Sequence, residues 1–276
     1  MKNIIILYSG GLDSYILYQY AKKNYPNDNI KAIYWNYYQD VAKIEISKLP
    51  NFVEIRNLDW MNLKGKTSIE CPGRNEGPIF IPGRNLVFAV LCACEDLPDE
   101  IWLGTLAGET HNKGTDKNYQ FLWNMNATLN YVLGPFLGEK KIECKFPLAD
   151  AGMNKLDCVN WALNNGITKE ELISTYSCHS GKDIPCGECV QCIKRWSIFG
   201  QNGFTEKYNV NPATTKQGLL MFEEMIRCKL GGDNPYYNQE SIQEILPFFM
   251  QYALKNQHLF DAKLINNIVM VKNLKN

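Results

Sequence analysis

The sequence has no excess of charge of either sign and no long hydrophobic run. Its 29 basic side chains match its 29 acidic ones, giving a formal net charge of zero, so strong nucleic-acid binding is not expected. The longest apolar run, Leu86–Cys94, has nine residues, whereas a membrane-spanning helix needs about 20. The N-terminal M-K-N-I-I-I-L resembles a signal peptide only briefly, because Ser9 and Gly10 follow. We therefore expect a cytoplasmic protein that does not bind membranes.

The glycine-rich segment near the N-terminus lacks the Walker A pattern and the G-x-G-x-x-G of dinucleotide-binding proteins. Residues 8–14 read Y-S-G-G-L-D-S instead, at the end of the apolar run 3–8 and before a helical pattern. A strand, a glycine-rich turn and a helix N-terminus together form an anion site, because the backbone can approach a phosphate and free N–H groups point at it. An ordinary strand-to-helix turn is the alternative.

The pattern S-G-G-x-D-S resembles the pyrophosphate loop of the N-type ATP pyrophosphatases. The resemblance implies that ATP is cleaved between its α- and β-phosphates, that an acceptor is adenylated and that pyrophosphate is released. It also implies a Mg²⁺ ion that bridges phosphate oxygens and needs the carboxylate of Asp13, which would make Asp13 catalytic. The expected ATP-binding residues are Tyr8, Ser9, Gly10, Gly11, Leu12, Asp13 and Ser14.

Apolar segments typical of strands alternate with segments typical of helices as far as residue 164. The alternation predicts an α/β fold with a doubly wound parallel sheet, whose ligands bind at the carboxyl ends of the strands. The Gly/Pro-rich stretch 61–83 is expected to form a long loop over the site. The expected strands are 3–8, 30–35, 52–57, 100–106 and 143–148, and the expected helices are 13–24, 40–49, 84–97, 117–133 and 154–164.

The strand pattern stops near residue 200. Residues 213–230, 239–255 and 261–272 have helical patterns. We therefore expect an ATP pyrophosphatase-type domain at 1–200, which includes a cysteine cluster at 178–192, and a helical C-terminal extension at 201–276.

Four cysteines lie close together in the pattern C-x7-C-x2-C-x2-C. Four thiolates suit tetrahedral Zn²⁺, and a site without an open position indicates a structural role, so we expect one zinc ion per chain. An iron–sulfur cluster could use the same sulfurs, His179 could replace the first cysteine, and unligated buried thiols are a third alternative. The expected ligands are Cys178, Cys186, Cys189 and Cys192.

The loop and the C-G-x-C-x-x-C cluster together resemble the 7-cyano-7-deazaguanine synthase (QueC) family over roughly residues 1–200. F-I-P-G-R-N-L-V-F at 80–88, G-T-L-A-G-E-T at 104–110, M-N-A-T-L-N at 125–130 and M-N-K at 153–155 follow the family order. The resemblance implies an ATP-dependent carbon–nitrogen ligase that converts 7-carboxy-7-deazaguanine and ammonia into the amide and then the nitrile, releasing AMP and pyrophosphate. The partners would be these small molecules, and a homodimer stays open.

Four residues outside the loop are candidates for the site. The fork of Arg84 suits phosphate or a carboxylate, so Arg84 is expected to serve catalysis and, with Asn85, substrate binding. Lys155 could neutralise phosphate charge as a third catalytic residue, and Asp116 could accept hydrogen bonds from a purine-like ring. An ion-paired arginine, a solvated lysine and an ordinary loop aspartate are the alternatives.

The chain departs from the family pattern in two places. The family's Y-P-D-C-R stretch falls near residues 113–120, where this chain has K-G-T-D-K-N-Y-Q, and more than seventy residues follow the cysteine cluster. Two other functions therefore stay open. One is an enzyme that activates a deazapurine or another acceptor but stops at the amide or joins it to a different amine. The other is a non-catalytic ATP-binding adaptor.

Overall fold

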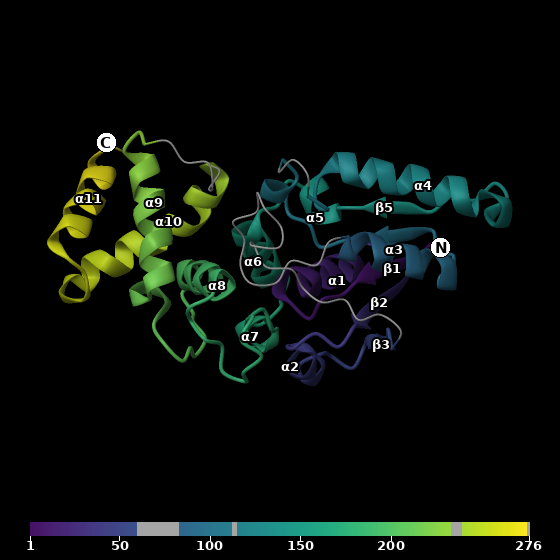
Figure 1. Ribbon diagram of the computed structural model, residues 1–276, viewed down its shortest axis with the longest axis horizontal. Coiled ribbons are helices and arrows are strands. Elements are labelled where there is room, and N and C mark those ends of the chain that lie inside the picture. The colour runs from purple at the N-terminus through teal and green to yellow at the C-terminus, as the bar shows by residue number, and fades with distance from the viewer. Residues whose placement is uncertain (60–82, 112–114, 233–238, 275–276) are drawn as a thin grey trace. The chain divides into compact units, whose positions relative to one another are not determined.

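A parallel sheet forms the centre of the N-terminal part of the molecule. The computed structural model describes residues 1–59, 83–111, 115–232 and 239–274. In these residues, five strands pair in the order β3-β2-β1-β4-β5, and all pairings are parallel (Figure 1). The direction of winding therefore reverses between the neighbouring strands β1 and β4. The strands are β1 (Asn3–Leu7), β2 (Asn29–Asn36), β3 (Val53–Asn57), β4 (Glu100–Trp102) and β5 (Glu143–Lys145).

Helices cover both faces of this sheet. On one face, α1 packs against β1 and β2 and buries Ile16 and Leu17 completely. On the other face, α3 and α4 bury Phe88 and Met125 in a core that includes alternate strand residues such as Ile5. The continuous apolar sequence of β1 suits this burial on both faces. The helices are α1 (Leu12–Asn24), α2 (Ala42–Ser47), α3 (Arg84–Asp96), α4 (Tyr119–Leu137) and α5 (Pro147–Asp150), with the 3-10 turn η1 (Ala107–Glu109).

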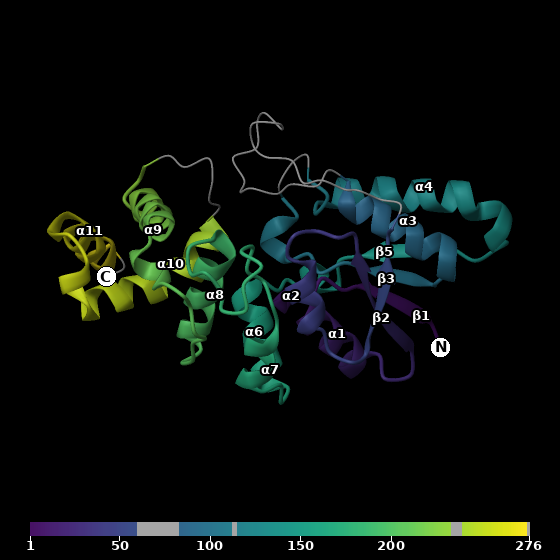
Figure 2. The ribbon, with the colours of Figure 1, turned by 60° about the horizontal axis from the view of Figure 1, so that its bottom comes forward.

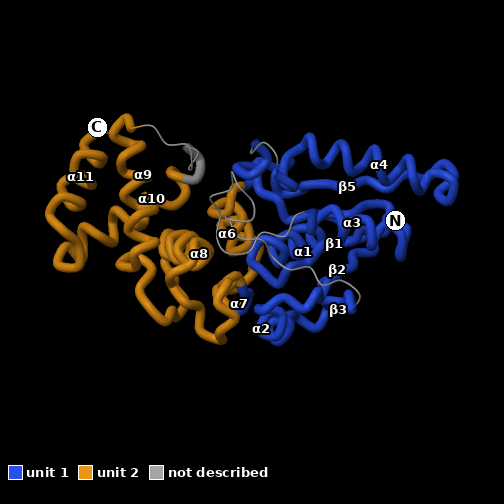
Figure 3. The backbone as a smooth tube through the Cα atoms, in the orientation of Figure 1, with its two compact units in different colours: residues 1–153, 174–176 blue, residues 154–173, 177–276 orange. Residues whose placement is uncertain are grey.

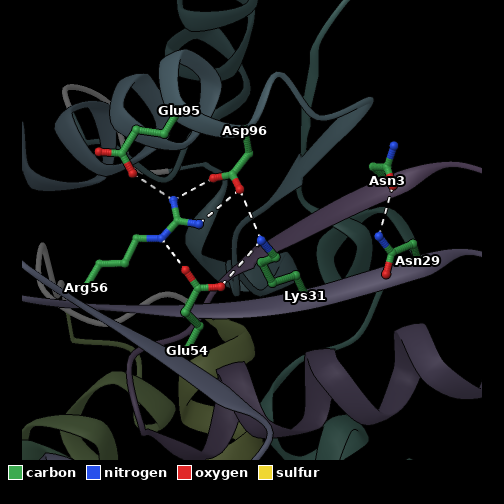
Figure 4. A network of polar contacts seen from close by, with 7 residues as sticks. All are labelled: Asn3, Asn29, Lys31, Glu54, Arg56, Glu95 and Asp96. Carbon is green, nitrogen blue, oxygen red and sulfur yellow. Dashed lines mark hydrogen bonds and ion pairs between the residues drawn. The ribbon is translucent and has the colours of Figure 1, made fainter.

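Ion pairs join the neighbouring strands β2 and β3 to the C-terminal end of α3 (Figure 4). Arg56 contacts Asp96 through both terminal nitrogens, at 2.5 and 3.0 Å, and Glu54 through Nε at 2.6 Å. Lys31 Nζ lies 3.1 Å from Asp96 Oδ1 and 3.4 Å from Glu54 Oε2. The guanidinium of Arg56 also lies 5.5 Å from the ring centre of Trp35. The network thus fixes the sheet edge against the core.

Glu100 is a buried carboxylate at the amino end of β4. It lies 2.5 Å from Lys2 Nζ and 2.9 Å from Lys145 Nζ, and it accepts a 2.7 Å hydrogen bond from the indole of Trp102. Burial raises the pKa of Glu100, but Lys2, Lys145 and Trp102 lower it by more, so the pKa lies below its ordinary value.

We expect Glu100→Gln to lower the free energy of unfolding by about 2 kcal/mol near neutral pH. Because the pKa of Glu100 is depressed in the folded state, its stabilisation is complete above the unfolded pKa of about 4.3 and is lost as the pH falls through the folded pKa. Denaturant unfolding at neutral and acidic pH measures this, and the difference between wild type and variant should shrink in acid. Glu143→Gln, which removes an exposed partner of Lys145, is the control, with an expected cost below about 0.5 kcal/mol. A pH-independent difference for Glu100→Gln would contradict the assignment.

The chain forms two compact units (Figure 3). Unit 1 contains Met1–Met153 and Ser174–Tyr176, and unit 2 contains Asn154–Ile173 and Ser177–Asn276. The two units do not test the predicted division at residue 200, because that division concerns which residues form the ATP-binding domain. The division at residue 200 therefore stays a prediction. The remaining helices are α6 (Lys155–Asn164), α7 (Lys169–Ser174), α8 (Val190–Gln201), α9 (Lys216–Lys229), α10 (Gln239–Lys255) and α11 (Ala262–Asn273), with 3-10 turns η2 (Pro212–Thr214) and η3 (Gln257–Leu259).

Helices α8 to α11 share one hydrophobic core in unit 2. Phe222 of α9 stacks on Phe249 of α10 with ring centres 3.8 Å apart, and Trp196 of α8 packs against Phe222 at 6.2 Å. Arg195 of α8, whose side chain is 5% exposed, forms a 2.6 Å ion pair with the equally buried Glu206. The extension is therefore packed on α8 as part of the same core.

The predicted α/β fold with a doubly wound parallel sheet is confirmed, as are the helices after residue 201. Strands β4 and β5 are shorter than predicted, because the chain turns into η1 after β4 and Pro147 begins α5 after β5. The expected loop 61–83 lies outside the described residues except for Gly83, and so does Pro82 of the P-G-R-N segment. None of the helices in the described residues is long and apolar enough to cross a membrane.

Candidate functional site

The glycine-rich loop connects the carboxyl end of β1 to α1. Gly10 has a φ of 79°, in the left-handed region that glycine adopts without strain. The hydroxyl of Ser14 donates to the Gly11 carbonyl at 3.0 Å and accepts from the Ser9 N–H at 3.2 Å. The Oγ of Ser9 lies 3.2 Å from that of Ser14. The two serines therefore hold the loop in its own closed shape.

The N-terminus of α1 is suited to bind an anion. Gly11, which has no side chain that could cap the helix, occupies the N-cap position, so the first-turn N–H groups can face a ligand. Gly104, in the connection after β4, packs against this turn: a Cβ there would lie 3.5 Å from Ser14 N and 3.6 Å from the carbonyl carbon of Asp13. The site thus lies where the winding reverses between β1 and β4, the usual ligand position in such sheets.

The side chains of the predicted ATP-binding residues differ in their exposure to solvent. The side chains of Tyr8 and Leu12 are in the core, 3% and 2% exposed, and burial raises the pKa of Tyr8 above its ordinary value. Contacts of these two residues with a nucleotide would therefore use the main chain. Asp13 is half-buried in the first turn of α1, where the helix dipole favours a carboxylate.

A polar cluster of Tyr34, Gln39 and Glu45 lies beside the loop. Tyr34 Oη donates to Glu45 Oε2 at 2.6 Å, and Gln39 Nε2 donates to both at 2.7 and 2.8 Å. A Cβ at Gly10 would lie 4.0 Å from Glu45 Cβ. The buried Oε1 of Gln39 has no hydrogen-bond partner among the described residues. Because buried acceptors are rarely left unpaired, this oxygen can accept from a ligand.

Arg84, at the start of α3, interacts electrostatically with Asp116, which lies before α4. Arg84 Nη1 donates to Tyr37 Oη at 3.3 Å. Desolvation lowers the pKa of this guanidinium, and Tyr37 and the carboxylates of Asp116 and Glu45 raise it by more, so the pKa is above its ordinary value. Asn85 follows Arg84 in the first turn of α3. The positive charge of Arg84 is thus favoured by the Tyr37 hydroxyl and by the carboxylates of Asp116 and Glu45.

Residues 115–118 are tied to the turn after β4. Lys117 Nζ forms an ion pair with Glu109 Oε1, and the other oxygen of Glu109 accepts from the Leu106 N–H at 3.1 Å. One carboxylate therefore holds both η1 and the segment that contains Asp116. Glu109 and Lys117 are not among the predicted site residues. Glu109 lies in G-T-L-A-G-E-T, but nothing in the sequence indicates that it pairs with Lys117.

Lys155 is the first residue of α6, in unit 2. The N-terminus of this helix is already capped: Asn154 and Asp157 exchange hydrogen bonds of 2.9 and 3.1 Å, and Glu244 accepts from the Leu156 N–H at 2.8 Å. Because these N–H groups are used, Lys155 would act on a phosphate through its side chain. Its catalytic role stays a prediction.

The four predicted cysteines converge in unit 2, and their Sγ atoms all lie within 4.8 Å of one another. Cys178 and Cys192 are buried, and Cys186 and Cys189 are half-buried. His179 is exposed and is not a member of this group. The arrangement is that of a site that could hold a metal ion.

A glycine and a later segment shape the cysteine turn. Gly187 has a φ of 82°, and a Cβ there would lie only 2.1 Å from the carbonyl oxygen of Val210. The N–H of Val210 donates to the Cys186 carbonyl at 3.3 Å, and the N–H of Asn209 donates to Pro185 at 2.9 Å. Residues beyond the cysteines therefore close the turn, and only glycine fits at 187.

The thiols interact strongly with one another. Hydrogen bonds from Cys189 and Cys192 lower the pKa of Cys178, and the same contacts raise the pKa of Cys189 and of Cys192. The backbone N–H groups of Ser180 and Cys186 donate to Cys178 Sγ at 3.4 and 3.2 Å. A metal cation would take the place of the shared protons, as metal binding to thiols requires. Four sulfurs without oxygen ligands fit Zn²⁺ or an iron–sulfur cluster.

Among solved structures, the U34-tRNA thiolase NcsA from Methanococcus maripaludis with its [4Fe-4S] cluster aligns with 91% of this chain and 72% of its own, at 14% identity and a TM-score of 0.35. A TM-score this low supports no conclusion about this chain.

Sequence comparison is more informative. A 7-cyano-7-deazaguanine synthase from Persephonella marina is 30% identical over 223 residues, which cover 75% of this chain and 96% of that protein. Synthases of the same name from Aquifex aeolicus and Thermoplasma volcanium are each 28% identical, covering 70% and 82% of this chain and 94% and 99% of their own. The model of the queuosine biosynthesis protein QueC matches residues 3–203, from β1 through the loop and the cysteines to the end of α8, and on this match the chain belongs to the QueC family.

Proposed function

We propose that the protein is an ATP-dependent ligase that converts 7-carboxy-7-deazaguanine and ammonia into 7-cyano-7-deazaguanine, as the names of its relatives suggest. The observation that carries the proposal is the loop 9–14, which is closed by its own serines and begins α1 with a glycine at the N-cap, at the winding reversal. Such a terminus favours a polyphosphate.

In this proposal the loop holds the pyrophosphate that leaves ATP. First-turn N–H groups of α1 and the hydroxyl of Ser9 donate to its oxygens, while Ser14 keeps the loop in shape through Gly11. Mg²⁺, held by Asp13 and phosphate oxygens, would neutralise charge. Phosphoryl chemistry of this kind depends mainly on positioning and charge neutralisation.

The acceptor would bind between the loop and the Arg84–Asp116 pair. A carboxylate oxygen of the base attacks the α-phosphorus, the bond to the bridging oxygen breaks and pyrophosphate leaves. Ammonia then attacks the acyl carbon and AMP leaves, which gives the amide. A second ATP activates the amide oxygen in the same way, and loss of AMP gives the nitrile. Arg84 and Asn85 would orient the carboxylate, Asp116 would read the ring, and Lys155 would neutralise phosphate charge.

The cysteine cluster is proposed to hold one structural zinc ion. A closed set of four thiolates has no position for a substrate or a reacting water. Its contribution would be to folding, because the ion would fix the turn 185–189 together with the backbone hydrogen bonds from Asn209 and Val210.

A second candidate is a related ligase that stops at the amide or joins the activated base to a different amine. The observation that favours it is the segment 115–118, which departs from the family pattern and is fixed by Lys117 to Glu109. A changed segment at the acceptor side can change the acceptor without altering the ATP chemistry.

One experiment separates these functions. The protein is incubated with ATP, Mg²⁺, ammonium and 7-carboxy-7-deazaguanine, and nucleotides and base are followed by mass spectrometry. AMP, pyrophosphate and the nitrile are expected. Amide alone would support the second candidate, and ATP binding without any cleavage would leave a nucleotide-binding adaptor.

Asp116→Asn is expected to weaken binding of the base at least about 10-fold and binding of ATP less than about 2-fold. The amide presents a donor where the ring needs an acceptor. Calorimetric titration with each ligand measures this, with the exposed Glu139→Gln as the control. Equal weakening of both ligands, or of neither, would show that Asp116 does not read the base.

A further inference from the structure

Helix α10 belongs to the C-terminal extension, beyond the residues 3–203 that match the QueC family. It nevertheless contacts a helix that carries a predicted catalytic residue. In unit 2, α8 packs against both α6 and α10 (Figure 2). The carboxylate of Glu244 in α10 accepts a 2.8 Å hydrogen bond from the N–H of Leu156 in α6. A side chain of the extension therefore holds the first turn of the helix that begins with Lys155.

Close packing fixes where α10 lies on α8. Gly200 of α8 has no side chain, and a Cβ there would lie only 2.0 Å from Cζ of Phe248 in α10. The ring of Phe248 therefore lies directly over the backbone of α8. Trp196 of α8 packs against the same ring, with the two ring centres 4.7 Å apart. Any residue larger than glycine at position 200 would push the two helices apart.

Hydrogen bonds give this packing a defined register. Pro247 lies inside α10 and, because it has no N–H, removes one hydrogen bond from the turn before it. In that turn the carbonyl of Ile245 accepts from the buried hydroxyl of Ser197, and the carbonyl of Glu244 accepts from the side-chain amide of Gln201. Sliding α10 along α8 would break both hydrogen bonds. The side chain of Glu244 is thus presented to α6 at one position.

The backbone at Lys155 is held on both sides. Two residues before it, the carbonyl of Met153 accepts from the N–H of Ala107 in η1 at 3.0 Å. One residue after it, the N–H of Leu156 donates to Glu244, at a helix end where the helix dipole favours a carboxylate. The first contact lies within unit 1 and the second within unit 2. The position from which the Lys155 side chain extends therefore depends in part on the extension.

We propose that the C-terminal extension completes the proposed phosphate site, with Glu244 as a positioning residue that fixes the backbone from which Lys155 reaches phosphate. A lysine side chain is flexible, so an origin that moves lowers the fraction of time its ammonium group spends in the productive position. The proposal rests on the phosphate role of Lys155 in the proposed function. The competing explanation is that Glu244 only stabilises unit 2.

A double-mutant cycle tests the proposal. Lys155→Ala should lower the kcat of pyrophosphate release about 100-fold, because charge on the phosphates is no longer neutralised. Glu244→Ala should lower kcat about 10-fold and leave the KM for the base within about 2-fold. The double variant should be no slower than Lys155→Ala, since Glu244 acts through that lysine. An additive loss of about 1,000-fold, or an unchanged kcat in either single variant, would overturn the proposal.

ATP binding separates this inference from the proposed function. A wild type that binds ATP but releases no pyrophosphate would contradict the proposed function. The same cycle is then measured on the dissociation constant of ATP by calorimetry, which needs neither an acceptor nor turnover. Glu244→Ala should weaken ATP binding, and the double variant should bind no more weakly than Lys155→Ala. No effect of Glu244→Ala, additive effects, or a wild type that does not bind ATP would overturn the inference.

Three further variants distinguish positioning from stability. Glu244→Gln keeps an oxygen that can accept from Leu156 and should retain at least about half of the wild-type kcat. Gln243→Ala changes the exposed neighbouring side chain of α10 and should retain kcat within about 2-fold. Melting curves by circular dichroism check that each variant folds. If Glu244→Ala is unfolded, Glu244→Asp takes its place, because it keeps the charge but withdraws the carboxylate by one methylene. A kcat that merely follows the melting temperature across these variants would show that Glu244 only stabilises unit 2.

Discussion

Asp13→Asn is expected to lower the rate of AMP and pyrophosphate formation at least about 1,000-fold and to leave the fold intact. Asparagine has the same shape but removes the negative charge that, in the proposed function, would help to hold a Mg²⁺ ion on the phosphates. A factor of 1,000 corresponds to about 4 kcal/mol of transition-state stabilisation, typical for the loss of a charged group at the reacting phosphate. The position in the first turn of α1 is half-buried, so the substitution changes little packing.

Pyrophosphate release under saturating ATP is the measurement. Asp40→Asn is the matched control, because Asp40 is an exposed carboxylate at the same edge of the sheet but outside the loop. It should retain activity within about 2-fold. If Asp13→Asn released pyrophosphate as fast as Asp40→Asn, the carboxylate of Asp13 would have no catalytic role.

Gly187→Ala is expected to remove the bound metal and reduce soluble yield severely. The new Cβ would lie 2.1 Å from the Val210 carbonyl oxygen, a contact that the backbone must move to relieve. Movement there separates Cys186 from Cys189, and a structural thiolate site loses affinity when its ligands move apart. Zinc measured by plasma mass spectrometry should fall from about one per chain to a small fraction.

Gly203→Ala is the control that separates the effect of the Cβ clash with Val210 from the effect of backbone strain at a positive φ. Gly203 has a φ of 71°, also left-handed, but a Cβ there meets nothing within 4 Å. This variant should lose about 1 kcal/mol of stability and keep its metal. Full zinc occupancy in Gly187→Ala would contradict the assigned site, and iron–sulfur absorption in anaerobically purified wild type would replace zinc by a cluster.

Much of the fold follows from local sequence patterns. Continuous apolar runs such as 3–8 can be buried on both faces of a sheet, and their alternation with helical segments leaves few topologies other than a parallel sheet. The cysteine cluster can be predicted from the sequence in the same way, because two overlapping C-x2-C turns bring thiols together through local geometry alone. The structure agrees with both predictions.

Contacts between distant segments could not be predicted in this way. The electrostatic interaction of Arg84 with Asp116 and the ion pair of Glu109 with Lys117 depend on how α3, η1 and the segment before α4 are arranged. No periodicity encodes such contacts. Helix α8 is not among the predicted helices: its first three residues belong to the predicted cysteine segment 178–192, and no helix is predicted for residues 193–201. The packing of the extension on α8 is therefore not predicted either.

The position of Cys192 in α8 couples metal binding by the cysteines to the folding of the C-terminal helices. The same helix supplies a thiol to the group of four cysteines and, through Ile193 and Trp196, side chains to the core shared with α9, α10 and α11. Ordering of α8 by a bound metal therefore lowers the entropy that the helical core must still lose. The coupling is reciprocal. If a bound metal raises the affinity of these C-terminal helices for another molecule by some factor, that molecule raises the affinity of the cysteines for the metal by the same factor.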